Sequence, residues 1–210
     1  MVLSLTGFTV VAGALLGWVN AVTTEPIAQA NAKILSDAIG VVVPAFDNNP
    51  AEAPETVEVD GQSYKVYKAT KEGKFVGAAV ESASMGFGGE LKVLVGFDTE
   101  GNIVDYSLLS HAETPGLGSK SADWFKKGAK GDITGMNPGK KALVVSKDGG
   151  EVNAITASTI TSRAFLKAVN NAYNAYRTQY ADAQPELQAG VMVDGESGAT
   201  IRVELDNENK

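Results

Sequence analysis

The chain has 210 residues, of which 44% are hydrophobic and 20% are charged, and its formal net charge is −7 at pH 7. It contains no cysteine and a single histidine, which excludes disulfides, thiolate catalysis, iron–sulfur clusters, thiolate zinc sites and multi-histidine metal sites. An acidic chain without a basic cluster also argues against nucleic acid as a partner.

The first segment of the chain is apolar enough to cross a membrane. No charged residue precedes Glu25, and residues 2–22 contain only four polar side chains. About 20 apolar residues rising roughly 1.5 Å each span a bilayer core of about 30 Å. We therefore expect a transmembrane anchor over residues 1–23. A cleaved signal peptide is the main alternative, because residues 28–30 resemble a small-residue cleavage site.

Residues 24–43 are expected to form a membrane-proximal helix and linker, with Thr24 as its cap and Pro26 in its first turn. Membrane orientation is poorly encoded, since no Lys or Arg precedes the apolar segment and the first basic residue is Lys33. A start site farther upstream would explain the missing basic residues.

Residues 44–180 show mostly strand patterns with a few helices. Apolar and alternating runs predict strands at residues 56–59, 64–67, 74–81, 91–97, 103–109 and 142–146. Helical patterns predict a short helix at residues 121–127 and a long amphipathic helix at residues 159–180. This order predicts an α+β fold, a single domain with an antiparallel-rich sheet and flanking helices. The remaining residues, 181–210, form an acidic tail.

Residues 111–118 predict a backbone-rich turn at the end of a strand. Pro115 fixes one backbone angle, and Gly116 and Gly118 permit conformations that let a flat ligand approach closely. Glu113 could add a polar group there. A plain strand-to-helix turn explains the same composition, so the residues alone leave both interpretations open.

Residues 156–162 place five hydroxyl side chains just before and within the start of the long helix. A helix N-terminus offers unpaired backbone N–H groups and a partial positive charge, which suit a phosphate. Arg163 adds a full positive charge nearby. The alternative is that one hydroxyl caps the helix and water solvates the others.

The single histidine, His111, could act as a general base near neutral pH. A hydrolase with His111 and Glu113 as acid and base is one alternative function. The interpretation that we prefer is a strand-end residue that shapes the loop. Spacing reveals no nucleophile–base pair, so we expect no catalytic residues and no metal.

The motifs occur in a specific order along residues 1–178. They are Gly86-Phe87-Gly88-Gly89, residues 94–98, Gly101-Asn102-Ile103, residues 111–118 with Lys120, Trp124 and Phe125, and residues 156–162. In this order the chain resembles the covalent-FMN-binding domain family. Within it the chain is most similar to the G subunit of the Rnf electron-transport complex and, less closely, to the C subunit of the sodium-translocating NADH:quinone reductase.

The resemblance implies a covalent site at Thr159, whose hydroxyl a separate flavin transferase would esterify to the FMN phosphate. It also implies that Thr156, Ser158 and Thr161 surround the phosphate. The wall against the flavin ring would be formed by Glu113, Thr114, Leu117, Gly118 and Lys120. The sequence departs from the family pattern: Ala157 replaces Gly, Ser158 replaces Ala, and Asn153 stands where Asp is usual.

A second candidate for the covalent site lies in the tail. Residues 194–200 read Asp-Gly-Glu-Ser-Gly-Ala-Thr, which matches the string that the transferase prefers better than the first site does. Thr200 is therefore a weaker alternative site, because the long amphipathic helix does not follow it. A chance match in an acidic tail is the other explanation.

By resemblance, the protein would carry electrons within a membrane-bound, ion-translocating ferredoxin–NAD oxidoreductase complex. It would be a redox subunit without a complete active site of its own, and its partners would be the other subunits. It would cross the bacterial inner membrane once, with the soluble domain on the outer, periplasmic side. The alternatives are the C subunit of the sodium-translocating reductase or a non-redox, membrane-tethered binding module.

Overall fold

A computed structural model of the chain describes residues 2–180, with side chains from residue 6 onward except at residue 28. Thr200 and the rest of the expected tail lie outside the described residues. Five strands form a single sheet in chain order, and each pairs antiparallel with the next: β1 (Glu55–Val59), β2 (Gln62–Lys71), β3 (Lys74–Met85), β4 (Glu90–Asp98) and β5 (Ile103–His111). The expected α+β fold with an antiparallel sheet is confirmed.

Two tight hairpins set the register of the first three strands. Asp60 and Gly61 join β1 to β2 with φ angles of 52° and 74°. Glu72 and Gly73 join β2 to β3 with the same pair of angles. Positive φ at both central residues is the geometry of a two-residue turn whose twist matches that of the strands.

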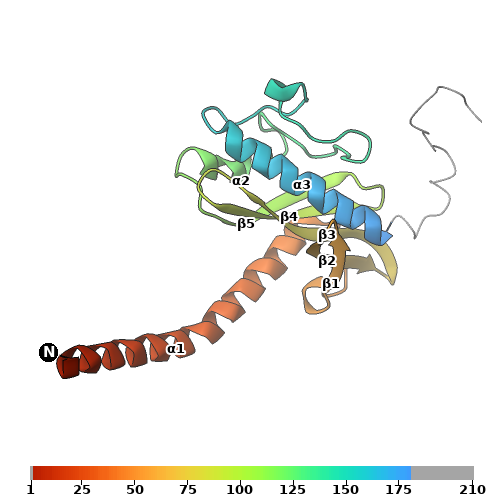
Figure 1. Ribbon diagram of the computed structural model, residues 1–210. Helices are drawn as coiled ribbons and strands as arrows, with labels where there is room; N and C mark the ends of the chain where they lie inside the picture. Colours follow the sequence, from red (N-terminus) through yellow and green to blue (C-terminus); the bar gives the residue numbers. More distant parts are fainter. Residues whose placement is uncertain (1, 181–210) are drawn as a thin grey trace, which may run out of the picture.

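The two faces of the sheet are covered by different helices (Figure 1). Helix α3 (Thr159–Tyr180) packs on one face and forms the larger core with alternate strand residues such as Val80, Val93 and Val95. The end of helix α1 (Val2–Val42) packs on the other face, where Ile39 and Val42 contact Leu94. The sheet therefore lies between α3 and the end of α1.

Short elements and loops make up the rest of the domain. They are the 3-10 helices η1 (Pro50–Glu52), η2 (Gly118–Lys120) and η3 (Ser146–Asp148) and the four-residue helix α2 (Ser121–Trp124). The long connection from α2 to α3 runs over the side of α3 away from the sheet (Figure 1), and its apolar residues join the larger core.

The expected strand at residues 142–146 is wrong. This segment makes a single parallel bridge between Val145 and Val152 and then turns into η3. Gly149, with φ of 87°, reverses the chain directly after η3. Residues 142–146 can therefore pair only with the few residues that follow this turn. The expected helix at residues 121–127 also ends early, at Trp124.

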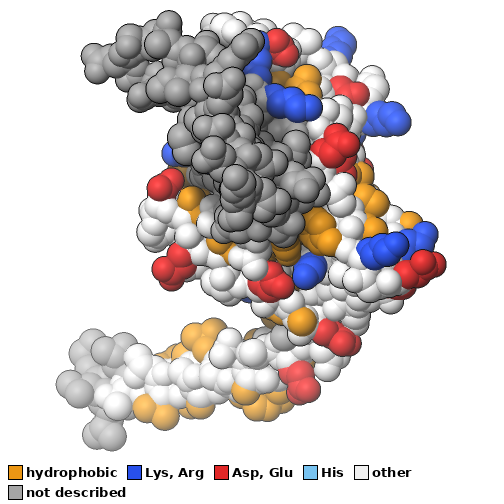
Figure 2. All heavy atoms as spheres, turned by 90° about the vertical axis from the view of Figure 1, so that its right-hand side faces the viewer, with side chains coloured by type: hydrophobic (Ala, Val, Ile, Leu, Met, Phe, Trp, Pro, Cys, Tyr) orange, Lys and Arg blue, Asp and Glu red, His pale blue; other side chains and the backbone are white. Residues whose placement is uncertain are grey.

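Helix α1 is continuous, so the expected helix start at Thr24 is wrong. The Thr24 hydroxyl donates to the carbonyl of Asn20 within the helix, at 2.6 Å, and Pro26 lies inside it. The helix is long and apolar enough to cross a membrane over Thr6–Val42, with a mean hydropathy of 1.4 and no part of the most apolar window buried. Apolar side chains are visible along its exposed surface (Figure 2).

The end of α1 meets the sheet at a glycine. A Cβ at Gly96 of β4 would overlap the carbonyl oxygen of Val42, so only a glycine lets the helix end lie this close. The contact fixes α1 to the sheet on the face opposite α3. The membrane-directed helix and the candidate site at the start of α3 are therefore held by opposite faces of one rigid layer.

Candidate functional site

A buried carboxylate, Glu113, joins three segments that are far apart in the sequence. Only 5% of Glu113 is exposed. Its Oε1 accepts hydrogen bonds from the backbone N–H groups of Phe87 and Gly88, at 2.8 and 3.3 Å. Its Oε2 accepts a hydrogen bond from the Thr161 hydroxyl at 2.8 Å. Glu113 thereby ties the β3–β4 hairpin loop to the first turn of α3.

Glycines allow the surrounding backbone to close on this carboxylate. A Cβ at Gly86 would overlap Glu113 Oε1, and a Cβ at Gly118 would overlap Glu113 Oε2. A Cβ at Gly88 would overlap the carbonyl oxygen of Ala112. Only glycine fits at these three positions, because neighbouring atoms lie where a Cβ would be. This accounts for Gly86 and Gly88 of the 86–89 motif and for Gly118 of the 111–118 motif.

His111 supports the same loop from the end of β5. Its side chain is exposed, and its Nδ1 accepts a hydrogen bond from the Glu113 backbone N–H at 3.2 Å. The carboxylate of Glu113 is meanwhile held by Phe87, Gly88 and Thr161 rather than by the imidazole. The geometry therefore gives His111 a loop-shaping contact.

The start of α3 is shaped by one of the five predicted hydroxyl residues. Ser162 accepts a hydrogen bond from the Ile155 N–H and donates one to the Ser158 carbonyl, both at 2.9 Å. The helical ladder begins with the Ser162 N–H bonding to the Ser158 carbonyl. The N–H groups of the three residues before Ser162 therefore precede the ladder, as at any helix N-terminus.

Thr159 is the first residue of α3 and is half-buried. The ammonium group of Lys147, in η3, donates a hydrogen bond to its Oγ1 at 3.3 Å. Arg163, the cation that the sequence placed near this site, instead forms a bidentate pair with Asp148, with both contacts at 2.7 Å. Those hydrogen bonds lower the pKa of Asp148 and raise the pKa of Arg163.

Lys147 is thus a residue of the candidate site that sequence reasoning missed. It lies twelve positions before Thr159, outside any motif, and only the turn at Gly149 brings it back to the helix start. No spacing rule predicts such a contact. The same return of the chain places Asp148 beside Arg163.

The other predicted site residues lie on two turns around this point. Thr156 is exposed and Ser158 is half-buried in the turn before α3. Thr114, Leu117 and Lys120 are exposed on the turn that follows Glu113. Thr161 is fully buried, and its hydroxyl is used by Glu113.

Exposed apolar side chains surround the Glu113 junction. Phe87 lies in the β3–β4 loop, which is hydrogen-bonded to Glu113, and Leu117 lies in the turn that follows Glu113. Ile160 precedes Thr161 in α3. All three are exposed to solvent although they are large and hydrophobic. Sequence reasoning did not single out Phe87 or Ile160 as site contacts, although an apolar side chain in a glycine-rich loop is a signal for one.

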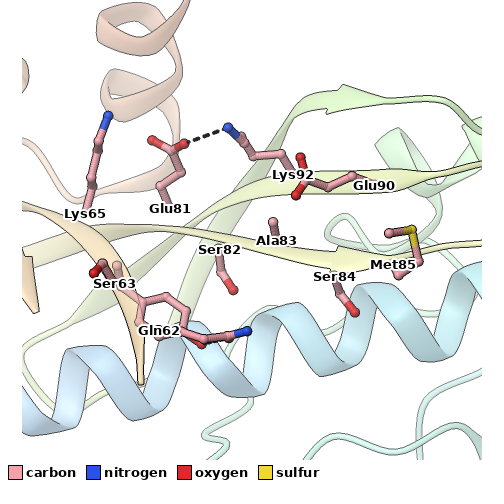
Figure 3. Close-up of a pocket in the computed structure, with 11 residues that line it drawn as sticks. Gln62, Ser63, Lys65, Glu81, Ser82, Ala83, Ser84, Met85, Glu90 and Lys92 are labelled. Carbon is pink, nitrogen blue, oxygen red and sulfur yellow. Dashed lines mark hydrogen bonds and ion pairs between the residues drawn. The ribbon is translucent and has the colours of Figure 1, made fainter. Parts of the chain in front are cut away.

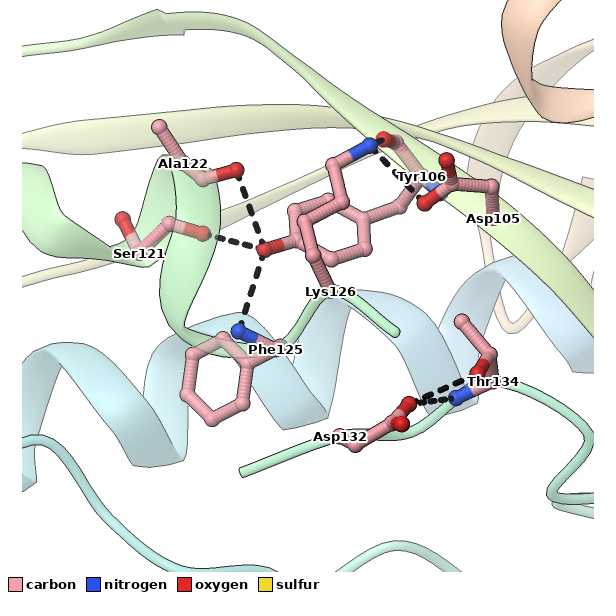
Figure 4. A network of polar contacts seen from close by, with 8 residues as sticks. All are labelled: Asp105, Tyr106, Ser121, Ala122, Phe125, Lys126, Asp132 and Thr134. Atoms are coloured by element: carbon pink, nitrogen blue, oxygen red, sulfur yellow. Dashed lines mark hydrogen bonds and ion pairs between the residues drawn. The ribbon is translucent and has the colours of Figure 1, made fainter. Parts of the chain in front are cut away.

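A hydrogen-bond network fixes the turn after Glu113 to the sheet (Figure 4). The buried Tyr106 of β5 donates to the Ser121 carbonyl at 2.7 Å and accepts from the Phe125 N–H at 3.2 Å. Burial raises the pKa of Tyr106, so it stays protonated. Lys126 lies over the Tyr106 ring and pairs with Asp105 at 2.8 Å.

Phe125 also stacks on Phe165 of α3, with ring centroids 4.3 Å apart. The Ser121 hydroxyl donates to the Gly118 carbonyl at 2.7 Å. The loop that carries Leu117 and Lys120 is therefore anchored at both ends, by Glu113 before it and by the Tyr106 network after it. Anchoring at both ends keeps the exposed site residues in fixed positions beside the start of α3.

Comparison with known proteins identifies the relatives of the chain. Residues 86–174 match the FMN-binding domain family. The chain is 35% identical over 191 residues to the G subunit of the ion-translocating oxidoreductase complex of Aliivibrio fischeri, covering 86% of this chain and 89% of that protein. It is 31% identical over 182 residues to the corresponding G subunit of Cereibacter sphaeroides, covering 83% and 82%.

A solved structure with some similarity is that of Shewanella oneidensis NqrC. It is 19% identical in sequence and aligns with a TM-score of 0.46, covering 68% of this chain and 73% of that one.

Proposed function

Because the chain belongs to the family of G subunits of ion-translocating oxidoreductase complexes, we propose that it carries electrons within such a complex through an FMN attached to Thr159. The FMN-binding domain match covers the β3–β4 loop, the turn after Glu113 and most of α3. The observation that carries the proposal is the accessible Thr159 hydroxyl at the first residue of α3, with a lysine ammonium group beside it.

The residues at the start of α3 fit a phosphate ester. A helix N-terminus offers N–H donors and a partial positive charge to an anion. Lys147 adds a full positive charge at the Thr159 oxygen. Thr156 and Ser158 add hydroxyls on the turn before the helix. Since the Thr161 hydroxyl is engaged by Glu113, we assign Thr161 to holding that carboxylate rather than to direct contact with the phosphate.

Attachment needs an activated flavin phosphate, which we propose that a flavin transferase supplies as a phosphoanhydride of FMN. The Thr159 O–H bond and the phosphoanhydride bond break, and an O–P bond forms. The proton and the other half of the anhydride leave together. Lys147 would stabilise the negative charge that the phosphate keeps after this exchange.

FMN supplies chemistry that accepts one or two electrons, while the protein supplies position and polarity. Phe87, Leu117 and Ile160 offer apolar surface that would shield a flat ring from water. Thr114 and Lys120 offer polar groups on the same turn as Leu117. Glu113 and Gly118 keep that turn close to α3, so they act through the loop.

The protein is membrane-associated, and we propose that α1 crosses the bacterial inner membrane once, with the sheet domain on the periplasmic side. At about 1.5 Å per residue, a 41-residue helix is roughly twice as long as a bilayer core is thick. The second half of α1 would then stand outside the bilayer and hold the domain at a set distance. Electron donor and acceptor would be other members of the complex.

Coexpression with a flavin transferase, followed by a denaturing gel scanned for flavin fluorescence, tests this proposal. We expect a fluorescent band for the wild type and for Thr178→Val, the matched control near the other end of α3. We expect no fluorescence for Thr159→Val and unchanged fluorescence for Thr200→Val. A wild-type protein without fluorescence, or fluorescence lost only in Thr200→Val, would contradict the assignment of Thr159.

A further inference from the structure

The sheet splits open between β2 and β3. The two strands pair from Lys71 and Lys74 as far as Lys65 and Glu81. Beyond that point β2 continues to pair with β1, and the last four residues of β3, residues 82–85, pair only with β4. A wedge-shaped cleft therefore opens between the first residues of β2 and the last residues of β3.

Backbone groups of β3 face this cleft. The Gly86 N–H bonds to the Gly89 carbonyl across the β3–β4 hairpin, and backbone bonding directions alternate along an antiparallel strand. The backbone N–H and C=O groups of Gly86, Ser84 and Ser82 therefore point toward β4. The N–H and C=O groups of Ala83 and Met85 point the other way, into the cleft, where pairing with β2 has ended.

The cleft has a volume of about 490 Å³, within the range of sites that hold a ligand. Ser82 is 3% exposed, and its hydroxyl has no hydrogen-bond partner among the described residues. Ser82 and Ser84 point toward α3, whereas Lys65, Glu81 and Lys92 lie on the opposite face of the sheet (Figure 3). The split strand edge, with backbone groups of β3 left without a neighbouring strand, indicates a site for an extended polypeptide.

We propose that residues 200–205 of this chain's own tail add to β3 as a strand in this cleft. Their sequence alternates strictly, with Ile201, Val203 and Leu205 apolar and the three residues between them polar. Such alternation is the pattern of a strand in a sheet with one buried face. An added strand gives the backbone groups of Ala83 and Met85 their missing partners, which is the usual basis of strand addition.

The tail begins at the right place and is long enough. Tyr180, the last described residue, stacks on Phe75 near the beginning of β3, with ring centroids 4.6 Å apart. The cleft lies ten residues farther along β3, a distance of roughly 33 Å. The 19 residues 181–199 can span about 60 Å when extended. The chain after Tyr180 is therefore long enough to reach the cleft.

The charges on the cleft match the polar face of the tail strand. One face of the cleft carries both signs, with Glu81 and Lys92 3.3 Å apart. The polar face of the tail strand also carries both signs, in Arg202 and Glu204. The apolar face would then lie on the α3 side, next to the larger core. This inference does not depend on the flavin chemistry.

Amide hydrogen exchange on the full chain in detergent tests strand addition. We expect the Ala83 and Met85 amides to exchange about tenfold or more slowly in the wild type than in Val203→Pro, since proline cannot continue a paired strand. Val191→Pro, the same change elsewhere in the tail, should leave both rates unchanged. The Ala79 and Glu81 amides, which pair with β2, should be unaffected in both variants.

Equal exchange of Ala83 and Met85 in the wild type and Val203→Pro would overturn the proposal. Protection that rises with protein concentration would indicate a second copy in the cleft and would also overturn it. The proposal would also be overturned if the Ala83 and Met85 amides were protected only after other members of the complex are added. In that case a strand of a partner would occupy the cleft.

Disulfide trapping gives an independent test, because the chain has no native cysteine. Ala83 faces the α1 side of the sheet, as does Ala79 two pairs away. Ala83→Cys combined with Arg202→Cys or Glu204→Cys should form an intramolecular disulfide at least several-fold faster than when combined with Ile201→Cys or Val203→Cys. Equal rates at all four tail positions would contradict a docked strand.

Discussion

Glu113 shows how one side chain can define a site without facing solvent. Its two oxygens accept three hydrogen bonds from the β3–β4 loop and from α3. The role of Glu113 is therefore to position other residues, because its hydrogen bonds fix the turn that carries the exposed residues. The same reasoning explains why the glycines around it cannot carry a Cβ.

Removal of the Glu113 side chain should lower the free energy of unfolding far more than removal of its charge alone. Glu113→Ala leaves two N–H groups and the Thr161 hydroxyl without partners, and we expect a loss of about 2–4 kcal/mol in the free energy of unfolding. Glu113→Gln keeps an acceptor for the N–H groups, and its amide can donate to Thr161. Urea unfolding measures both, and equal losses would show that the charge itself matters.

Ala157 is a residue in a conformation that favours glycine. Its φ is 62°, and a non-glycine residue in this left-handed region costs roughly 1–2 kcal/mol. Ala157→Gly should therefore stabilise the protein by about 0.5–1 kcal/mol, after allowance for the greater freedom of glycine in the unfolded chain. The control is Ala154→Gly, at a position without positive φ, which should destabilise. Thermal unfolding that shows the same sign for both would contradict this explanation.

The Asp148–Arg163 pair should titrate at low pH. Arg163 donates hydrogen bonds to the Asp148 carboxylate and lowers its pKa, so the pair's contribution to stability is present above the ordinary value of about 3.9 and is lost as the pH falls through the lowered pKa. Carboxyl-carbon NMR should place the Asp148 midpoint below that value. Arg163→Gln should raise the midpoint toward the ordinary value, with Lys147 still lowering it, and an unchanged midpoint would contradict the pairing.

At the scale of the elements, the position of α1 depends on a close approach to the sheet. Gly96→Ala would force a Cβ against the Val42 carbonyl, and we expect a loss of about 1–3 kcal/mol or more, as for overpacking of a core. Gly40→Ala is the matched control, because a Cβ there meets nothing within 4 Å and a helical position favours alanine. Denaturant unfolding should therefore show opposite signs for the two substitutions.

Elements whose signals are local were predictable from sequence. The Asp60-Gly61 turn and the first residue of α3 lie where the sequence indicates them, because turn chemistry and helical periodicity act over a few residues. Residues 142–146 have the composition of a strand, but strand formation needs a partner elsewhere in the chain. Composition cannot supply that partner.

Contacts between distant segments could not be predicted from sequence. The hydroxyl-rich motif indicated the start of α3, but Lys147 reaches Thr159 only through the return of the chain after η3. The sequence offered Arg163 as the cation for an anion, but in the fold it pairs with Asp148. The family resemblance likewise placed Thr161 among several phosphate contacts, and the structure engages it with Glu113.

At the scale of the whole molecule, a single sheet connects the apolar helix α1 to the proposed attachment site at the start of α3. Helix α1 holds one face and α3 holds the other (Figure 1), so the start of α3 lies at a fixed place relative to the end of α1. This arrangement suits a carrier that must bring one cofactor repeatedly to the same partners.

The mass of tryptic peptides from protein coexpressed with a flavin transferase tests the attachment site most directly. Cleavage at Lys147, Arg163, Arg177 and Arg202 separates residues 148–163, which contain Thr159, from residues 178–202, which contain Thr200. We predict that the first peptide is heavier by one FMN less one water, with fragment ions that place the addition on Thr159, and that the second peptide is unmodified. An addition found only on residues 178–202, or on neither peptide, would contradict the account.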